Sequence, residues 1–282
     1  MGTSLILGFF DGVHLGHQAV IRSAINFAKD NNIVLLTFKE SPAKFFCGHA
    51  DYILSRENSI KKLKNLRVDE VVLQDFEEIH SQSAEEYLNF ILNKYKPESI
   101  STGYNYTFGI NKSGTPELLK AFQKSFKYIC VPPVKCEGEI VSSTLIKNYL
   151  KDGNIKQAGK VLGSKFILEG TVIKGQQLGR KIGFPTANFN YPKDIVQIPF
   201  GAYAVKTLNH AGIMNFGIKP TIEGNREPVV EVHLINYEGD LYGKNISVEI
   251  VEKLRSEKKF ANTEELKIQI QKDKEECLKL SL

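Results

Sequence analysis

Along the first half of the chain, short apolar runs alternate with segments whose apolar residues recur at helical spacing. The apolar runs are typical of buried strands; they cover residues 4–10, 33–38 and 70–73, and a fourth strand is expected near Ile100. Between them lie segments with one apolar face, which are predicted to be helices: residues 16–30, 57–66 and 84–95. This alternation favours a parallel sheet covered by helices.

From Lys165 onward, the pattern changes to short strands separated by glycine and proline. The predicted strands cover residues 166–173, 202–208, 229–237 and 245–251. Many short strands with turn residues between them indicate a small antiparallel barrel. The chain ends in a predicted helix, with Asn262 or Thr263 as its N-cap and Glu265 completing the capping arrangement.

These patterns predict two domains, which also suits the length of 282 residues. We expect an α/β domain over residues 1–157. A small antiparallel β-barrel domain with a C-terminal helix is expected over residues 158–282, and the boundary lies within a polar, glycine-containing segment at 151–159. No internal repeat or low-complexity tract interrupts either half.

The composition fits a globular protein and limits the cellular locations that the chain is expected to have. Hydrophobic residues are 42%, charged residues 24% and the net charge is +5. Such a mild positive charge suits a nucleic-acid binder or an enzyme of anionic substrates. For the charge alone, lysines scattered over the surface are the better explanation. No apolar run is long enough for a bilayer, no signal-like segment opens the chain, and the four cysteines form no C-x-x-C pair. We therefore expect reduced thiols and a cytoplasmic location.

The segment at residues 8–17, GFFDGVHLGH, carries the first candidate site. A buried strand runs through a glycine-bearing turn into a helix, an arrangement that places phosphates at the positive end of the helix. His14 and His17 are three residues apart and share a face, so they could donate hydrogen bonds to the α-phosphate and pyrophosphate of ATP. Gly12 and Gly16 would let the backbone come close. By itself, H-x-G-H more often marks two surface histidines on a loop.

A second hydroxyl-rich segment supports the first. Ser142, Ser143 and Thr144 precede Lys147 at the start of a predicted helix. Hydroxyls at a helix start together with one cation can bind an anion. An ordinary N-cap is the better explanation of this segment taken alone.

The second half contains a glycine-spaced loop followed by P-T-A-N. The glycines at 170, 175, 179 and 183 suit a flexible loop over a nucleotide, with neither a Walker motif nor a G-x-G-x-x-G fingerprint. Alternation puts the Thr186 and Asn188 oxygens on one side, where they could hold Mg²⁺ with ATP phosphates. For the bare tetrapeptide, a turn entering a strand is the better explanation.

A candidate base follows on a later strand. Glu231 lies in VEVHLIN, and a carboxylate can accept the proton of a primary hydroxyl that attacks a phosphate. Without further context, a solvent-facing glutamate on an amphipathic strand is the simpler explanation.

The motifs of the first half resemble those of the bacterial bifunctional FAD synthetase family, in its adenylyltransferase part. The resemblance rests on G-x-F-D-G-V-H-x-G-H, on GYNYTFG at 103–109 and on V-S-S-T-x-I-K. It implies that residues 1–157 form an α/β Rossmann-like nucleotidyltransferase domain. It also implies catalytic roles for His14 and His17 and a flavin contact at Phe108. The ATP-binding residues that it implies are Gly8, Phe10, Asp11, Gly12, Gly16, Asn105, Ser142, Ser143, Thr144 and Lys147. The chain departs from the family where Lys147 replaces arginine and where TFKESP, at 37–42, lacks the usual histidine.

The second half resembles the family's riboflavin kinase domain from end to end. The matching segments are GRKIGFPTAN, NFGIKPT at 215–221, EVH, GDLYGK at 239–244 and LRSEKKF at 254–260. The resemblance implies a six-stranded barrel, with Glu231 as the base toward the ribityl hydroxyl. It implies ATP-binding by Gly170, Gly175, Gly179, Pro185, Thr186 and Asn188, with Mg²⁺ held by Thr186 and Asn188. The flavin contacts that it implies are Tyr242, Arg255, Glu257 and Phe260.

We therefore expect an enzyme that makes FMN from riboflavin and ATP and then FAD from FMN and ATP, with Mg²⁺. Its expected partners are these small molecules, with no nucleic acid or membrane, and the chain is expected to be a monomer or a weak homo-oligomer. One alternative is that only one half is fully active, as a riboflavin kinase with a weak adenylyltransferase. Another is a non-catalytic flavin-binding regulator that touches nucleic acid, although no clustered basic face with interleaved aromatics supports it.

Overall fold

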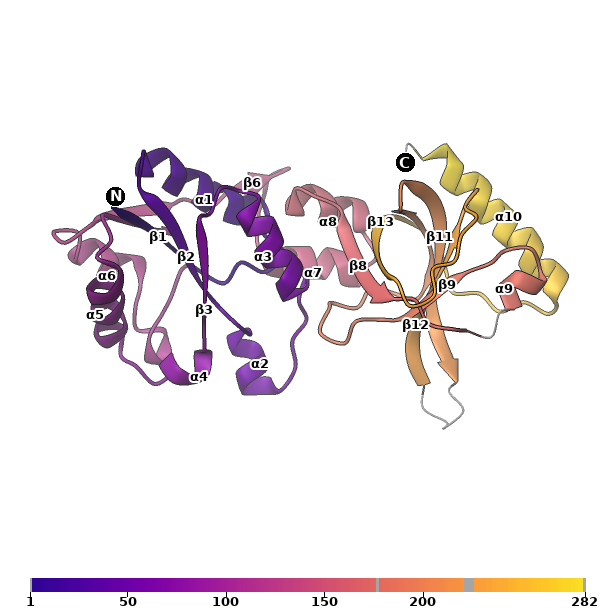
Figure 1. The fold of residues 1–282 in the computed structure, drawn as a ribbon, viewed down its shortest axis with the longest axis horizontal. Coiled ribbons are helices and arrows are strands. Elements are labelled where there is room, and N and C mark those ends of the chain that lie inside the picture. The colour runs from indigo at the N-terminus through magenta and orange to yellow at the C-terminus, as the bar shows by residue number, and fades with distance from the viewer. Residues whose placement is uncertain (1, 176–177, 221–225, 281–282) are drawn as a thin grey trace. The chain divides into compact units, whose positions relative to one another are not determined.

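The computed structural model of the protein describes residues 2–175, 178–220 and 226–280 (Figure 1). The chain divides into two compact units. The first unit comprises Met1–Ser143 with Val161–Gly163, and the second comprises Thr144–Lys160 with Ser164–Leu282. The segment proposed as a boundary, 151–159, overlaps helix α8 (Ile155–Leu162), and the border at residue 157 stays a prediction. Within the described ranges, no helix is both long enough and apolar enough to cross a membrane.

The first unit is built on a five-stranded parallel sheet. Its strand order is β3-β2-β1-β4-β5, and every neighbouring pair runs parallel. The strands are β1 (Thr3–Leu7), β2 (Asn32–Phe38), β3 (Glu70–Gln74), β4 (Ser99–Gly103) and β5 (Lys127–Val131). β1 is the central strand of this sheet. Because the strands are parallel, the loop that follows β1 lies at the carboxyl edge, where open α/β sheets bind ligands.

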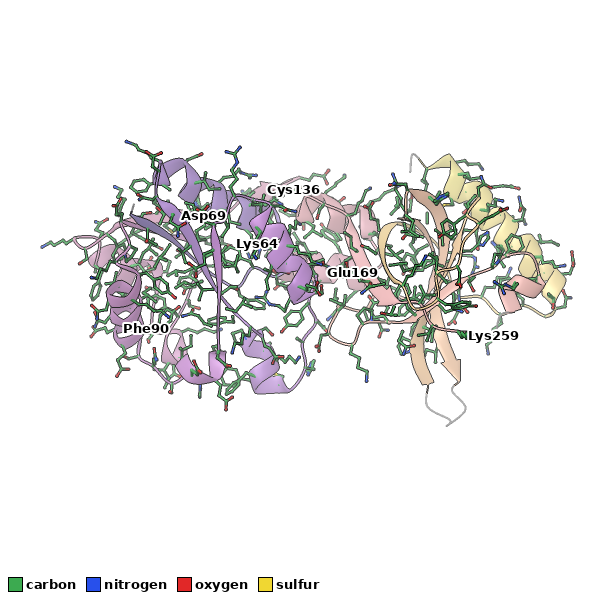
Figure 2. All side chains as sticks on the ribbon, in the orientation of Figure 1. Lys64, Asp69, Phe90, Cys136, Glu169 and Lys259 are labelled. Carbon is green, nitrogen blue, oxygen red and sulfur yellow. The ribbon has the colours of Figure 1, made fainter. Side chains whose placement is uncertain are left out.

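Helices cover both faces of this sheet because side chains alternate along each strand. Leu5 and Leu7 of β1 lie in one apolar cluster, with Leu88 and Leu119 from α5 (Ala84–Tyr95) and α6 (Pro116–Ala121). Ile6 lies in the opposite cluster, which includes residues of α1 (Leu15–Ala28) and α3 (Arg56–Lys64). Side chains fill the space between the sheet and the helices (Figure 2).

Shorter elements complete the first unit. They are α2 (Pro42–Cys47), α4 (Phe76–Ile79), a 3-10 turn at Ile110–Lys112 and a hairpin of β6 (Lys135–Cys136) and β7 (Glu139–Ile140). The predicted strands and helices of this half are confirmed, with ends shifted by a few residues. The strand expected at 4–10 ends at Leu7, which leaves residues 8–14 to form a loop.

The second unit is a nearly closed antiparallel barrel of six strands, as the sequence predicted. The strand order is β8-β13-β10-β11-β12-β9, and all pairs are antiparallel. The strands are β8 (Phe166–Thr171), β9 (Ala187–Asn190), β10 (Gly201–Thr207), β11 (His210–Pro220), β12 (Arg226–Leu234) and β13 (Asn245–Ser256). A bridge between Ile173 and Asn188 joins the two end strands, with the Ile173 amide donating to the Asn188 carbonyl at 2.7 Å.

Helices α7 (Ser143–Lys151), α8, α9 (Leu178–Lys181) and α10 (Thr263–Lys279) complete the chain. The C-terminal helix α10 begins as predicted: the Asn262 side chain caps it by accepting from the Glu265 amide at 2.9 Å. The Glu265 carboxylate accepts from the Ala261 amide at 3.1 Å, one residue before the cap. Cys277 packs the helix against Ala204 and Ile213 of the barrel.

Candidate functional sites

The loop after β1 brings the two predicted histidines together at the start of α1. His14 is the N-cap of this helix, and its Nδ1 accepts a hydrogen bond from the His17 amide at 3.3 Å. The two rings stack, with centroids 3.6 Å apart and planes 15° from parallel. Gly16 lies close against the His14 ring, where a Cβ would come within 3.2 Å of it. Both imidazoles thus occupy one spot at the carboxyl edge of the sheet, at the positive end of a helix.

The backbone of this loop is held in an unusual conformation. Gly12 has φ of 75° and Val13 has φ of 51°, a region that β-branched residues rarely adopt. Val13 is fully buried in the apolar cluster on the α1 face of the sheet. The Lys62 ammonium donates to the Gly12 carbonyl at 3.0 Å, and the Gln18 amide donates to the Val13 carbonyl at 3.1 Å. Strain maintained in this way is typical of functional loops.

The histidine rings are held in their neutral form. Burial, helped by the nearby Lys62 ammonium, lowers the pKa of His14 to about 4. Burial, with His14 and Lys62 beside it, also lowers the pKa of His17 well below its usual range. At neutral pH, each ring therefore presents one N–H donor and no charge.

Acidification should destabilise the first unit because of His14. Its folded pKa of about 4 lies below the ordinary value of 6.5, so between these values the unfolded chain binds more protons than the folded one. The associated stability is present above pH 6.5 and is lost as the pH falls toward 4, a change of about 3 kcal/mol at most. Urea unfolding between pH 4 and pH 7 should show a weaker pH dependence for His14→Gln than for the wild type.

His49 offers a matched control for this experiment, because its side chain is exposed. His49→Gln should keep the pH dependence of the wild type. Equal pH dependence in His14→Gln and the wild type would contradict the burial of a neutral His14.

The other predicted residues around this loop have varied positions. Gly8 follows β1 and donates its amide to the Leu36 carbonyl at 3.3 Å. Phe10 is 1% exposed and packs on the His17 ring at 5.0 Å between centroids. The buried Asp11 carboxylate accepts from the Ile53 amide at 2.8 Å, which ties the loop to the segment before α3. Phe10 and Asp11 thus stabilise the loop through contacts within the protein, and their contact with ATP stays a prediction.

The predicted serine segment reaches the same loop in part. The Ser143 hydroxyl donates to the Asp11 carbonyl at 3.5 Å, and Ser142 precedes it within the first unit. Thr144 and Lys147 follow on α7, in the second unit. Asn105 is exposed in the loop after β4, the neighbour of β1. The contacts of these residues with ATP stay predictions.

An aromatic cavity of about 280 Å³ lies in the same unit and includes the predicted flavin residue Phe108. Its wall also contains Phe38, Phe46, Phe76 and Tyr87. Phe38 lies 6.5 Å from Phe9 of the histidine loop, ring to ring, so the cavity adjoins that loop. The wall is mostly apolar and aromatic, which suits a flat ring system such as an isoalloxazine.

In the second unit, the predicted base lies in a row of polar side chains across three strands. Glu231 of β12 is directly opposite Asn188 of β9 on one side and Asn215 of β11 on the other. Residues opposite each other on neighbouring strands point to the same face. All three line one cavity of about 310 Å³, together with Thr186. The structure therefore brings the P-T-A-N oxygens and the glutamate to one place.

Three of the predicted flavin residues, Arg255, Glu257 and Phe260, also line this cavity. The Arg255 guanidinium is held by Asp273 of α10, with Nε at 3.0 Å and Nη2 at 2.8 Å from the same carboxylate oxygen. It also lies over the Phe260 ring, 5.7 Å from its centroid. Because Asp273 is only 2% exposed, this forked ion pair fixes α10 and the cavity wall to each other.

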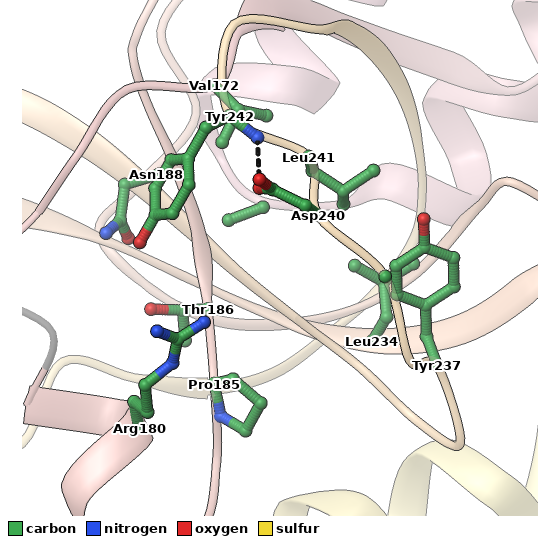
Figure 3. Close-up of a pocket in the computed structure, with 12 residues that line it drawn as sticks. Val172, Arg180, Pro185, Thr186, Asn188, Leu234, Tyr237, Asp240, Leu241 and Tyr242 are labelled. Carbon is green, nitrogen blue, oxygen red and sulfur yellow. Dashed lines mark hydrogen bonds between the residues drawn. The ribbon is translucent and has the colours of Figure 1, made fainter.

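Tyr242, the fourth predicted flavin residue, lies at a separate cavity of about 80 Å³. Figure 3 shows it beside Asn188, with Arg180 pointing toward Thr186 below them. Pro185 lines this cavity, whereas Thr186 and Asn188 line both cavities. The P-T-A-N segment is thus the wall that the two cavities share, and the structure does not group Tyr242 with Arg255.

The predicted glycines serve close packing as well as loop conformation. Gly175 lies against the Asn188 amide, where a Cβ would collide with it. Gly179, in α9, lines the cavity of Glu231 and approaches the Phe184 carbonyl. Gly170 is in β8 and faces the Phe189 ring. Contact of these glycines with ATP stays a prediction.

The oxygens predicted to hold Mg²⁺ fit that role. Asn188 is 6% exposed, and its buried Oδ1 has no hydrogen-bond partner among the described residues. An orphaned buried oxygen beside a threonine hydroxyl suits a hard cation that takes its other ligands from phosphates and water. In the described parts of the chain, no cluster of three acidic, histidine or cysteine side chains offers a metal site.

Several residues of these sites were missed by reasoning from the sequence. Lys62 comes from a helix far along the chain, and Asp273 reaches its cavity through the packing of α10. Arg180, Asn215 and His233 lay inside recognised motifs, G-R-x-x-G-F-P-T-A-N, NFGIKPT and E-V-H, so these motifs could have indicated them. The His233 ring bonds the Pro185 carbonyl at 2.9 Å and so supports the P-T-A-N segment. Thr221, the end of NFGIKPT, lies outside the described residues.

Comparison with known proteins matches both halves of the chain. An FAD synthetase model matches residues 1–145, and a riboflavin kinase model matches residues 162–281. The bifunctional riboflavin kinase/FMN adenylyltransferase of Buchnera aphidicola subsp. Schizaphis graminum is 35% identical over 286 residues, which are 96% of this chain and 91% of that protein. The Haemophilus influenzae protein of the same name is 34% identical over 287 residues, covering 97% and 92% of the two chains.

A solved structure shares the whole fold. A crystal structure described as a macrolide-efflux protein from Streptococcus pneumoniae is similar with a TM-score of 0.91 at 32% identity, over 99% of this chain and 95% of that chain. The efflux description belongs to that protein, while both domain models and the curated relatives agree on flavin enzymes. The chain therefore belongs to the bifunctional riboflavin kinase/FMN adenylyltransferase family.

Proposed function

We propose that this bifunctional riboflavin kinase and FMN adenylyltransferase phosphorylates riboflavin in its barrel unit and adenylylates FMN in its parallel-sheet unit. ATP is the co-substrate of both reactions. The observation that carries the assignment is the row of Asn188, Glu231 and Asn215 across three strands, inside one cavity. In that cavity, the Glu231 carboxylate lies near the oxygens of Thr186 and Asn188, which suit a cation bound to the phosphates of a nucleotide.

In the barrel unit, Glu231 acts as the general base. It accepts the proton of the riboflavin 5′-hydroxyl while that oxygen bonds to the γ-phosphorus of ATP and ADP leaves. The flavin ring takes the part of the cavity near Phe260 and Arg255, and the nucleotide takes the part shared by Thr186 and Asn188. The Asp273 carboxylate keeps Arg255 in place, and the His233 bond to Pro185 steadies the nucleotide side.

In the parallel-sheet unit, the reaction needs no base. An FMN phosphate oxygen, already anionic, bonds to the α-phosphorus of ATP while pyrophosphate leaves. His14 and His17 donate hydrogen bonds to the phosphates as neutral imidazoles, at the positive end of α1. The aromatic cavity beside Phe108 takes the flavin ring. Gly12, Gly16, Asn105, Ser142 and Ser143 complete the proposed ATP site of this unit. The ATP contacts that the family resemblance implies for Thr144 and Lys147 stay predictions.

We further propose Mg²⁺ as the metal of both reactions, held in the barrel by Thr186 and Asn188. When bound, it neutralises phosphate charge. The unfilled hydrogen-bonding capacity of the buried Asn188 Oδ1 supports this assignment.

The finer organisation is proposed on similar grounds. A Rossmann-like nucleotidyltransferase domain over residues 1–157 agrees with the parallel strand order and the helices on both faces, and residues 158–282 form the kinase domain. The four cysteines are free thiols, which suits a reducing cytoplasm. We propose that the chain acts there on riboflavin, FMN, FAD and ATP, as a monomer or weak homo-oligomer without nucleic-acid or membrane partners.

A time course tests the proposed function directly. The purified chain is incubated with riboflavin, ATP and Mg²⁺, and the flavins are separated at intervals. FMN should form first and FAD should follow. Formation of FMN without FAD would contradict the proposed adenylyltransferase activity. The chain would then be a riboflavin kinase with an inactive first unit. No flavin phosphorylation at all would contradict the proposal.

A further inference from the structure

The histidine loop has a cation that no sequence motif indicated. Lys62 lies on α3, and its Nζ donates to the Gly12 carbonyl at 3.0 Å across 50 residues of chain. The Gly12 carbonyl that it contacts lies two residues before His14, and the charge of Lys62 helps to lower the pKa of both His14 and His17. Gly12, His14, His17 and Lys62 all belong to the first unit, so their arrangement does not depend on the position of the second unit.

The charges of this loop explain why a cation matters there. Both imidazoles are neutral, so they can donate hydrogen bonds to a phosphate but cannot neutralise it. Burial lowers the pKa of Lys62 to about 8, which still leaves its ammonium form in the majority at neutral pH. A partly desolvated cation interacts more strongly with an anion than one in bulk water. Lys62 therefore supplies a positive charge near the histidine pair.

The ammonium can serve the backbone and a ligand together. It carries three N–H donors, so it can exchange another partner for a phosphate oxygen while it keeps the bond to the Gly12 carbonyl. The Gly12 carbonyl precedes Val13, whose positive φ sets the entry into α1. Lys62 thus stands at the point where the loop turns toward the helix that His14 caps.

We propose that Lys62 is a further catalytic residue of FMN adenylylation, whose ammonium contacts the pyrophosphate that leaves ATP. This inference rests on the proposed adenylyl function of the first unit. As the FMN oxygen bonds to the α-phosphorus, the bond from that phosphorus to the bridging oxygen breaks, and its electron pair stays on the pyrophosphate. The ammonium stabilises this growing negative charge, and no proton needs to move.

Three substitutions separate the charge of Lys62 from its bond to the backbone. Lys62→Arg keeps the charge, Lys62→Gln keeps a neutral N–H donor, and Lys62→Met keeps neither. Lys64→Gln is the matched control, because Lys64 lies on the same helix with an exposed side chain (Figure 2). Each variant is assayed for FAD formation from FMN and ATP, and for the reverse conversion of FAD and pyrophosphate to FMN and ATP. Thermal unfolding and riboflavin phosphorylation are measured beside them.

We expect Lys62→Gln and Lys62→Met to lower kcat/KM for ATP and for pyrophosphate by about 10- to 100-fold, the usual effect of one charge-assisted hydrogen bond. Lys62→Arg should recover much of this loss, while Lys64→Gln and the kinase reaction should stay at wild-type levels. The proposal is overturned if Lys62→Gln works within about threefold of the wild type, or if folded Lys62→Arg is no better than Lys62→Gln. If the wild type forms no FAD, the adenylyl function itself fails instead.

Discussion

Glu231→Gln should abolish FMN formation from riboflavin while leaving FAD formation from supplied FMN unchanged. The amide keeps the size of the side chain and its place between Asn188 and Asn215, but it cannot accept the proton of the ribityl hydroxyl. Loss of a general base costs about 10²- to 10⁴-fold in rate. The measurement is the initial rate of each reaction, followed separately by chromatography of the flavins.

Glu169→Gln provides a matched control for this variant. Glu169 lies on β8 of the same barrel and lines neither of its two cavities. Its replacement should leave both reactions at wild-type rates. A Glu231→Gln protein that still phosphorylates riboflavin normally would remove the carboxylate from the mechanism. Loss of both reactions in a folded protein would show that the division between the units is wrong.

His17→Ala should have the opposite effect, with FAD formation lost and FMN formation kept. The substitution removes an imidazole that stacks on His14 and is proposed to donate to the phosphates of ATP. Removing one such donor to a developing charge costs about 10²- to 10³-fold in kcat. Because the pKa of His17 lies well below its usual range, the rate of FAD formation by the wild type should not depend on His17 protonation between pH 6 and pH 8. The loss caused by His17→Ala should therefore be the same across this range.

The control for this variant must account for packing, because the His17 ring also contacts Phe10. His17→Gln refills part of the space and supplies an amide donor, so its rate of FAD formation should lie between those of His17→Ala and the wild type. Exposed His49→Ala should change neither reaction. The idea would be refuted by a His17→Ala protein that makes FAD at the wild-type rate.

Periodicity alone was enough to predict most of the secondary structure. Helical spacing gave the helix at 84–95 with both ends correct, because its cap at Ser83 is coded locally. Periodicity says less about exposure: Phe27 lies between the buried Ala24 and Ala28 of α1 but is 40% exposed. It also did not indicate β11, where Gly212 and Gly217 interrupt the apolar pattern. Such glycines depend on their partners: a Cβ at Gly212 would meet the His233 carbonyl on the next strand.

The sites were predictable only as far as their motifs extend. The P-T-A-N oxygens and Glu231 are far apart in sequence, and the motifs suggested their partnership. The strand register then places Asn188 directly opposite Glu231. No local pattern marks Asp273, whose role depends on how α10 packs beside Arg255. Nor does any pattern mark Lys62, a lysine on a helix rich in lysines. Residues that act through tertiary contact leave no trace in a single sequence.

In the first unit, the residues proposed to contact phosphates and those proposed to hold the flavin ring come from different loops. A redesigned enzyme could therefore change one set without the other. The histidine loop follows β1, whereas the aromatic wall comes from segments after β2, β3 and β4. Loops at the carboxyl edge of such a sheet can vary while the strands keep their packing. An engineer could therefore reshape the wall around Phe46 and Phe76 to admit another phosphorylated acceptor and keep the nucleotide chemistry intact. The scaffold lends itself to retargeting one loop at a time.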